Sequence, residues 1–284
     1  MRLLATTLLV PALLFAGAGT AAAANDPVAC GDALTTNTRL TGSLYCEDGP
    51  GLRIDTPGVT LDLGGHSIVG SAGIGVSVTA DGVTVSDGEV VGFPVGVYTG
   101  TPENEYEYAG GFDLPDLPPT DDQGPQATVV LDRLEIDRNG DLGLEVAGSA
   151  TTLTGSALVG NDIGARAEYG GELRVAASEV TGNGLGLQAL EGGPVRVEKS
   201  LLRRNGTAAG CSESAVFVAD SVVADNSTGI DYFVCGGSSV VRSFFSHNDQ
   251  HVASEGFPDQ LPTVGCTVFV LGGPAPDFPK APCF

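Results

Sequence analysis

The sequence has no tryptophan, one methionine and only two lysines in 284 residues. Lysine and arginine together number 13 against 35 aspartate and glutamate residues, so the formal net charge is -22 at pH 7. Phosphate binding needs clustered cations, so this charge balance argues against nucleic acid as a partner. The 42 glycines and abundant Val, Thr, Ser, Asp and Asn are poor for long helices and good for short strands and tight turns. An all-β protein is the expectation.

After the first residues, the sequence has no long apolar run. A membrane helix would need roughly 20 consecutive apolar residues. Residues 1–24 combine a charged start, an apolar stretch that ends at Phe15 and the small residues Ala21 to Ala24. This order is typical of an export signal that is removed on maturation. We expect a secreted, extracellular protein without a transmembrane segment, and a monomer.

Cysteine pairs with CxxC spacing are also missing, which argues against a zinc or redox site. Six cysteines in an exported chain predict three disulfides. Pairing nearest neighbours gives Cys30–Cys46, Cys211–Cys235 and Cys266–Cys283, although the sequence alone leaves the connectivity open.

What the sequence does contain is a repeat with an asparagine at a fixed place. Successive asparagines are separated by 22, 22, 22, 21 and 22 residues, and a similar hexapeptide ends on each one. They are Asn139, Asn161, Asn183, Asn205, Asn226 and Asn248. A repeat of this length without a leucine-rich pattern fits a coil of three short strands and three bends.

Alternation within the repeat predicts two apolar ladders that run from coil to coil inside the protein. The first strand contributes Leu131, Leu153, Val175, Val197 and Val218. The second contributes Ile136, Leu158, Val180, Leu202, Val223 and Phe245. We expect the asparagines to form a third, structural ladder, each bonding its neighbours and adopting the left-handed backbone conformation of the bend. Asn205 and Asn226 match the glycosylation sequon but belong to this ladder.

The segment from Gly58 to Ile68, GVTLDLGGHSI, followed by Gly82-Val-Thr-Val85 and Gly92-Phe93, resembles the opening coils of bacterial pectin-lyase-like β-helix repeat proteins. The resemblance covers roughly residues 30–255. It implies an all-β fold, a single-stranded right-handed parallel β-helix of about 8–9 coils with covered ends. That superfamily includes polysaccharide lyases, hydrolases and epimerases as well as binding and surface proteins, so function has to come from a site.

The repeat and the resemblance together predict a chain of four parts. The signal peptide is followed by a disulfide-clipped cap over 25–52, the β-helix over 53–255 and a proline-rich tail over 256–284. The repeat is interrupted once, by an acidic, proline-rich loop over 99–126 that leaves a third strand and returns into a first strand. In the related enzymes such loops wall the sugar-binding face, while a disordered excursion is the alternative.

Candidate site residues lie on the outer side of the first strands. Arg174 and Arg196, one period apart, could bind a uronate carboxylate, and Asp132 or Glu198 could act as the base. Tyr106 and Tyr108 of the loop are candidates for substrate binding. A solvated face of mixed charge is the competing interpretation.

Cofactors are not expected, although acidic residues of the loop offer oxygen ligands for calcium. These are Glu103, Glu105, Glu107, Asp113, Asp116, Asp121 and Asp122. No motif of the pectin hydrolase, alginate epimerase or pectate lyase type is present. The preferred interpretation is a non-catalytic or degenerate carbohydrate-binding surface protein. The alternatives are an enzyme acting on acidic, uronate-containing polysaccharide and a purely structural surface protein.

Overall fold

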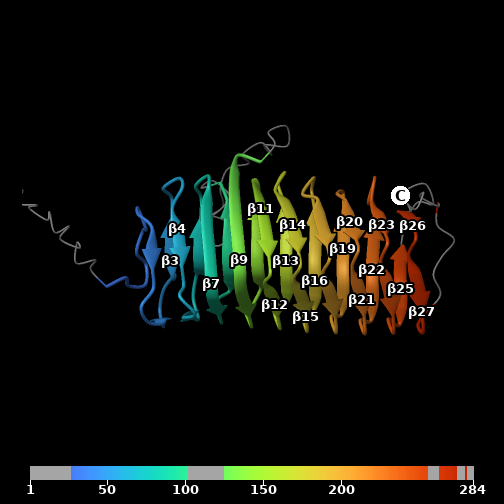
Figure 1. Ribbon diagram of the computed structural model, residues 1–284, viewed down its shortest axis with the longest axis horizontal. Helices are drawn as coiled ribbons and strands as arrows, with labels where there is room; N and C mark the ends of the chain where they lie inside the picture. Colours follow the sequence, from blue (N-terminus) through green and yellow to red (C-terminus); the bar gives the residue numbers. More distant parts are fainter. Residues whose placement is uncertain (1–26, 102–124, 255–261, 274–278, 280–284) are drawn as a thin grey trace, which may run out of the picture.

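Each repeat forms three short strands, and corresponding strands of successive repeats pair in parallel. The result is a right-handed parallel β-helix of about nine coils, counted by the nine strands of the third sheet. The computed structural model describes residues 27–101, 125–254, 262–273 and 279. Figure 1 shows the coils stacked in chain order along one long axis. The fold class predicted from the repeat is confirmed.

Two of the three strand columns belong to one 18-stranded sheet, because β7 and β9 each run through the first corner without a break. The first strands are β1 (Thr38–Arg39), β4 (Thr60–Asp62), the starts of β7 (Val83–Val91) and β9 (Ala127–Asp137), β11 (Ser149–Thr154), β14 (Glu172–Ala176), β17 (Val195–Glu198), β20 (Val216–Ala219), β23 (Ser239–Val241) and β26 (Thr263–Gly265). The second strands are β2 (Leu44–Cys46), β5 (Ser67–Gly70), the ends of β7 and β9, β12 (Ala157–Val159), β15 (Glu179–Thr181), β18 (Leu201–Arg203), β21 (Val222–Ala224), β24 (Phe244–Ser246) and β27 (Val268–Val270).

The third strands form a separate sheet on the remaining side of the coil. They are β3 (Leu52–Ile54), β6 (Ile74–Val78), β8 (Val95–Gly100), β10 (Leu142–Ala147), β13 (Ile163–Glu168), β16 (Leu185–Leu190), β19 (Thr207–Ser212), β22 (Thr228–Phe233) and β25 (Gln250–Ser254). Among the residues that the structure describes there is no helix, and hence none that could cross a membrane.

The core consists of the predicted apolar ladders. Leu131, Leu153 and Val175 are successive register partners, and so are Ile136 and Leu158. These side chains are fully buried. Because inward residues of one coil pack directly on those of the next, the core extends through the whole stack instead of closing around one centre.

The asparagines form a hydrogen-bonded ladder at the second corner. From Asn139 to Asn226, each Nδ2 donates to the Oδ1 of the asparagine one coil on, at 2.8 to 3.1 Å, and each backbone N–H donates to the same oxygen. Phe93 N–H donates to Asn139 Oδ1 at the start, and Asn248 Nδ2 lies 3.2 Å from His251 Nδ1 at the end. All six asparagines are buried, including those of the two sequons.

The left-handed backbone expected at the asparagines lies one residue earlier. Arg138, Gly160 and Gly182 have positive φ, whereas no ladder asparagine is among the positive-φ residues described. The expectation was wrong because the asparagine side chain is needed inside the coil, and the residue before it completes the bend with its side chain outside. Gly160 and Gly182 are favoured there because glycine adopts positive φ without a steric penalty.

Two of the three predicted disulfides are confirmed. Cys30–Cys46 ties the segment before β1 to the end of β2, and Cys211–Cys235 links two neighbouring coils. The third pair, Cys266–Cys283, has one member outside the described residues.

The solenoid extends beyond both predicted ends. Strands β1 and β2, within the predicted cap 25–52, pair with β4 and β5. Strands β26 and β27, within the predicted tail 256–284, pair with β23 and β24. These end strands carry neither the repeated asparagine nor the motif that resembles known β-helix proteins, and they were assigned to the cap and the tail.

The insertion lies between β8 and β9, at the position where the repeat was predicted to be interrupted. Val85 is the register partner of Leu131, so the repeat resumes in register after the insertion. Thr99 belongs to β8 and β9 begins at Ala127, which narrows the predicted loop slightly. Residues 102–124 of it, with residues 1–26 that include the predicted signal peptide, lie outside the described residues.

Candidate functional site

The outer face of the first strands brings three of the predicted site residues together. Arg174 and Arg196 are direct register partners on β14 and β17. Arg174 Nη2 donates to Glu198 Oε2 at 2.7 Å, and the guanidinium carbon of Arg196 lies 4.2 Å from the ring centre of Phe217. Both cations therefore already have partners within the protein.

Asp132 lies apart from these residues. The register column that joins Asp132 to Glu198 passes through Thr154 and Ala176, which is three coil steps, or roughly 14 Å at ~4.8 Å per step. Asp132 is instead paired with Arg133. Two carboxyl groups that hydrolyse a glycosidic bond lie about 5–10 Å apart, so Asp132 and Glu198 are not placed to act on one bond.

The remaining predicted residues lie in the segment outside the described residues. These are the substrate-binding candidates Tyr106 and Tyr108 and the acidic residues considered for calcium.

A groove of about 940 Å³ runs along the first corner, between the first and second strands, and we call it the corner groove. One wall consists of outward side chains of the second strands, one from each of seven consecutive coils. They are Ser67, Glu89, Glu135, Ala157, Glu179, Leu201 and Val222. Six coil steps of ~4.8 Å give the groove a length of roughly 29 Å.

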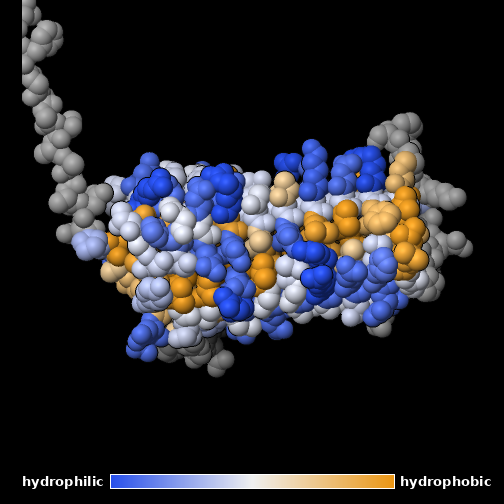
Figure 2. All heavy atoms as spheres, turned by 60° about the horizontal axis from the view of Figure 1, so that its bottom comes forward, coloured by the Kyte–Doolittle hydropathy of each residue, from blue (hydrophilic) through white to orange (hydrophobic). Residues whose placement is uncertain are grey.

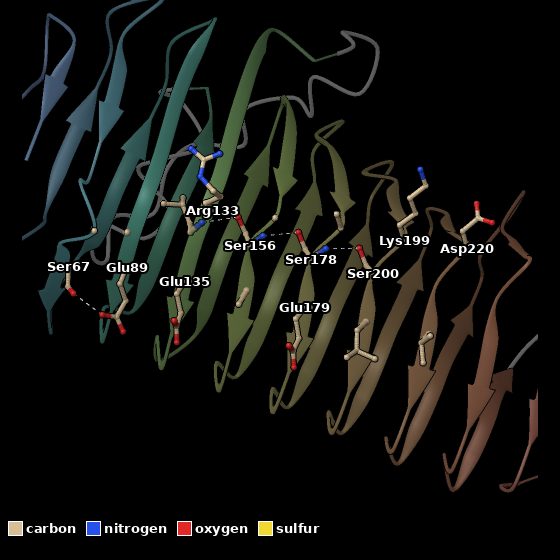
Figure 3. A pocket seen from close by; sticks show the side chains of 18 residues that line it. Ser67, Glu89, Arg133, Glu135, Ser156, Ser178, Glu179, Lys199, Ser200 and Asp220 are labelled. Carbon is tan, nitrogen blue, oxygen red and sulfur yellow. Dashed lines mark hydrogen bonds between the residues drawn. The ribbon is translucent and has the colours of Figure 1, made fainter.

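The opposite wall is the column of residues that turn the first corner. Arg133, Gly155, Ala177, Lys199 and Asp220 lie there, all with positive φ. These residues lie at the outside of the corner, so the column forms an edge above the second-strand residues, lowest at Gly155 and Ala177. Figure 3 shows Arg133, Lys199 and Asp220 on one side of the groove, and Glu89, Glu135 and Glu179 on the other.

A ladder of serines forms the floor. Ser156, Ser178 and Ser200 each donate the hydroxyl hydrogen to a carbonyl two residues earlier, at 2.8 Å. Each hydroxyl oxygen accepts the backbone N–H of the residue one coil before, at 2.9 to 3.2 Å. The serines are buried and their hydrogen bonds are used internally, so the floor is rigid and the groove walls carry the available polar groups.

A cluster of three carboxylates lies near the N-terminal end of the groove, and two of them, Glu89 and Glu135, line it. Glu89, Glu135 and Asp137 each have an oxygen within 4.8 Å of the others. Partial burial raises the pKa of Glu135, and the nearby charges of Glu89 and Asp137 raise it further. Asp137 is buried and paired with Arg138 at 2.7 Å, and Ser67 Oγ donates to Glu89 at 2.7 Å. Oxygen ligands at this spacing could hold a hard divalent cation.

Most other charges along the groove have partners. Arg133 is paired with Asp87 and Asp132, Asp220 is paired with Arg242, and Glu179 is paired with Arg203. Within the part of the chain that the structure describes, no lysine or arginine forms an ion pair with Glu89 or Glu135. The unmatched charge at this end of the groove is negative.

The second-strand wall changes character toward the C-terminal end. Leu201, Val222, Phe244 and Val268 are consecutive register partners and form an apolar stripe. Val222, Phe244 and Val268 are 37%, 41% and 50% exposed. Figure 2 shows apolar surface gathered toward the C-terminal end, flanked by hydrophilic side chains.

Sequence reasoning selected the first-strand face and overlooked the groove. Glu135 and Glu179 stand in the repeated hexapeptides directly after Leu134 and Ser178, at positions that alternation predicts to point outward. Applying to the second strand the alternation that was applied to the first would have found this row. The closeness of Glu89 to Glu135, 46 residues apart, depends on the register across the loop.

No protein-family model matches the sequence, and no curated protein matches it significantly. Among solved structures, the A-module of a mannuronan C-5 epimerase from Azotobacter vinelandii is similar, with 14% sequence identity and a TM-score of 0.46. The match covers 86% of this chain and 60% of the epimerase module, so the chain spans less than two thirds of that module.

Proposed function

We propose that this protein is a secreted, non-catalytic β-helix protein that binds an extended polysaccharide along the corner groove. The observation that carries the proposal is the length and regularity of the groove, which takes wall residues from seven consecutive coils. A linear polymer can follow such a groove and repeat similar contacts from coil to coil. The two disulfides, Cys30–Cys46 and Cys211–Cys235, support an oxidising, extracellular location.

The chemistry of the groove supports a carbohydrate ligand. Carboxylates and a lysine provide hydrogen-bonding groups along the walls, while Gly155, Ala157 and Ala177 leave the middle of the groove wide. Sugar hydroxyls both donate and accept hydrogen bonds, so they suit walls of this kind. The net charge of -22 supports the expectation that nucleic acid is not the ligand.

A paired substitution tests the proposal. Arg133 and Lys199 occupy the corner column with positive φ, so Ala177→Arg should be accommodated while filling the groove. Thr154→Arg is the matched control, because it adds the same side chain on the outer first-strand face, one coil from Asp132. Affinity electrophoresis of the full chain on gels containing neutral, amino-bearing and acidic polysaccharides should show retention on at least one polymer.

We expect Ala177→Arg to weaken that retention about tenfold or more and Thr154→Arg to leave it within about twofold. The reverse order would place binding on the first-strand face. Retention on none of the polymers would leave the structural surface protein as the better description.

A second candidate function is hydrolysis of the bound polysaccharide. The observation that favours it is the raised pKa of Glu135 beside Glu89 and Asp137, since glycosidases pair a protonated carboxylic acid with an ionised carboxylate. Release of reducing ends from any retained polymer, abolished by Glu135→Gln, would establish it. Retention without product keeps the non-catalytic proposal.

A further inference from the structure

Two carboxylates at the N-terminal end of the corner groove, those of Glu89 and Glu135, form no ion pair with any described lysine or arginine, and the charge of Arg138 offsets only part of the repulsion at Glu135. Glu89 on β7 and Glu135 on β9 are direct register partners, with carboxylate oxygens within 4.8 Å. The Glu135 side chain reaches solvent although neighbouring atoms partly desolvate its carboxylate, and Glu89 is half-buried. Two like charges held this close by the backbone register disfavour each other, and a cation between them would remove the repulsion.

The sign of this charge discriminates between polysaccharides. A uronate carboxylate brought to Glu89 and Glu135 would meet like charge in a partly desolvated groove, which is unfavourable. A primary ammonium group has three donors and a compact charge, so it can donate to both carboxylates at once. Glu179, two coils on, is already paired with Arg203, so the uncompensated negative charge of the groove is concentrated at one position, three coils from the groove's lysine, Lys199.

The other end of the groove suits the apolar parts of the same ligand. Leu201 and Val222 line the groove, and Phe244 continues their row by one coil. The C–H faces of a pyranose ring pack on aliphatic and aromatic side chains of this kind. A chain that lies along the groove therefore meets carboxylates at one end and apolar side chains at the other.

We propose that the ligand of the corner groove is a linear polysaccharide of amino sugars with free amino groups, one ammonium lying between Glu89 and Glu135. This inference rests on the proposed function, because it names the class of polysaccharide that the groove binds. It replaces the uronate polymer that Arg174 and Arg196 suggested, since those arginines have partners already.

Calorimetry of the full chain with four probes tests the inference. The probes are a β-1,4-linked glucosamine oligosaccharide, its fully N-acetylated counterpart, and an oligouronate of similar length with EDTA or with calcium. We expect the glucosamine oligosaccharide to bind about tenfold or more tightly than the acetylated one, because acetylation removes the charge-assisted hydrogen bonds. High salt should reduce that difference.

Glu89→Gln and Glu135→Gln keep the shape of the side chains and remove the charges, so each should bring the two affinities closer together. Glu172→Gln is the matched control, since Glu172 is exposed at the start of β14 and lies outside the groove. Equal affinity for the amino and acetylated oligosaccharides, or binding of the uronate that requires calcium, would overturn the inference and leave the proposed function standing. Binding of none of the probes would count against both.

Discussion

The asparagines of the second corner and the carboxylates of the corner groove are both polar groups stacked from coil to coil, but they differ in what surrounds them. Each asparagine amide from Asn139 to Asn226 donates to the next coil and to a backbone carbonyl. Glu89 and Glu135 stand side by side with like charge and no described ion-pair partner. A polar column with internal partners stabilises the coil, whereas one without them is available to a ligand.

The first-strand face stands between these extremes. Its charges are exposed like those of the groove, yet Arg174 is bonded to Glu198 and Arg196 stacks on Phe217. Exposure and charge therefore do not identify a binding surface unless the partners of each group are known.

The largest expected effect is a loss of stability when one asparagine of the ladder is removed. Asn183→Ala removes the acceptor for both the backbone N–H and the side-chain Nδ2 of Asn161, which are buried. At about 1–3 kcal/mol for each unsatisfied group, the free energy of unfolding should fall by roughly 2–6 kcal/mol. Chemical denaturation measures this loss.

Thr181→Ala is a control for Asn183→Ala in the same coil, because Thr181 points outward from β15. If Asn183→Ala cost no more than Thr181→Ala, the ladder would not stabilise the coil as described here.

A smaller effect is expected on the first-strand face. Since Arg174 and Arg196 have internal partners, Arg174→Ala and Arg196→Ala should change retention on the bound polysaccharide by no more than about twofold. A loss approaching that of Ala177→Arg would show that both surfaces contact the ligand and would remove the contrast between them.

The smallest effect concerns the stability of the free protein. Burial and neighbouring carboxylates raise the pKa of Glu135 above its ordinary value of 4.5. The folded state therefore holds this proton more strongly than the unfolded state, and the associated stability is present below pH 4.5 and is lost as the pH rises through the raised pKa.

Glu135→Gln removes the destabilising charge, so the variant should have a higher Tm than the parent at pH 7 and a similar Tm near pH 4. Thermal melts across this range measure the difference. A variant that is less stable than the parent at pH 7 would mean that Glu135 has a stabilising partner in the free protein.

The fold could be predicted from the sequence because the repeat constrains it directly. One asparagine in every 22 residues fixes the coil, and alternation around it identifies the inward residues, such as Leu158 and Val180. The strands of the end coils carry neither this asparagine nor the motif that resembles known β-helix proteins, and they were assigned to the cap and the tail. The left-handed residue was misplaced by one position, because the sequence does not distinguish the residue that bends from the residue that fills the bend.

The site was harder to predict because it depends on which charged side chains already have partners within the protein. The hydrogen bond from Arg174 to Glu198 depends on the side-chain rotamer of Arg174. The approach of Glu89 to Glu135 depends on strand pairing across 46 residues of sequence. Neither is visible in a local pattern.

The length of the bound polysaccharide tests the central claim most directly, since the corner groove is roughly 29 Å long over six coil steps. The Kd should be measured for a series of oligosaccharides of the retained polymer, from disaccharide upward. Affinity should rise with each added sugar until the oligosaccharide matches the groove and then level off, and Ala177→Arg should remove the rise. An affinity that is already maximal for the disaccharide, or a rise unaffected by Ala177→Arg, would contradict it.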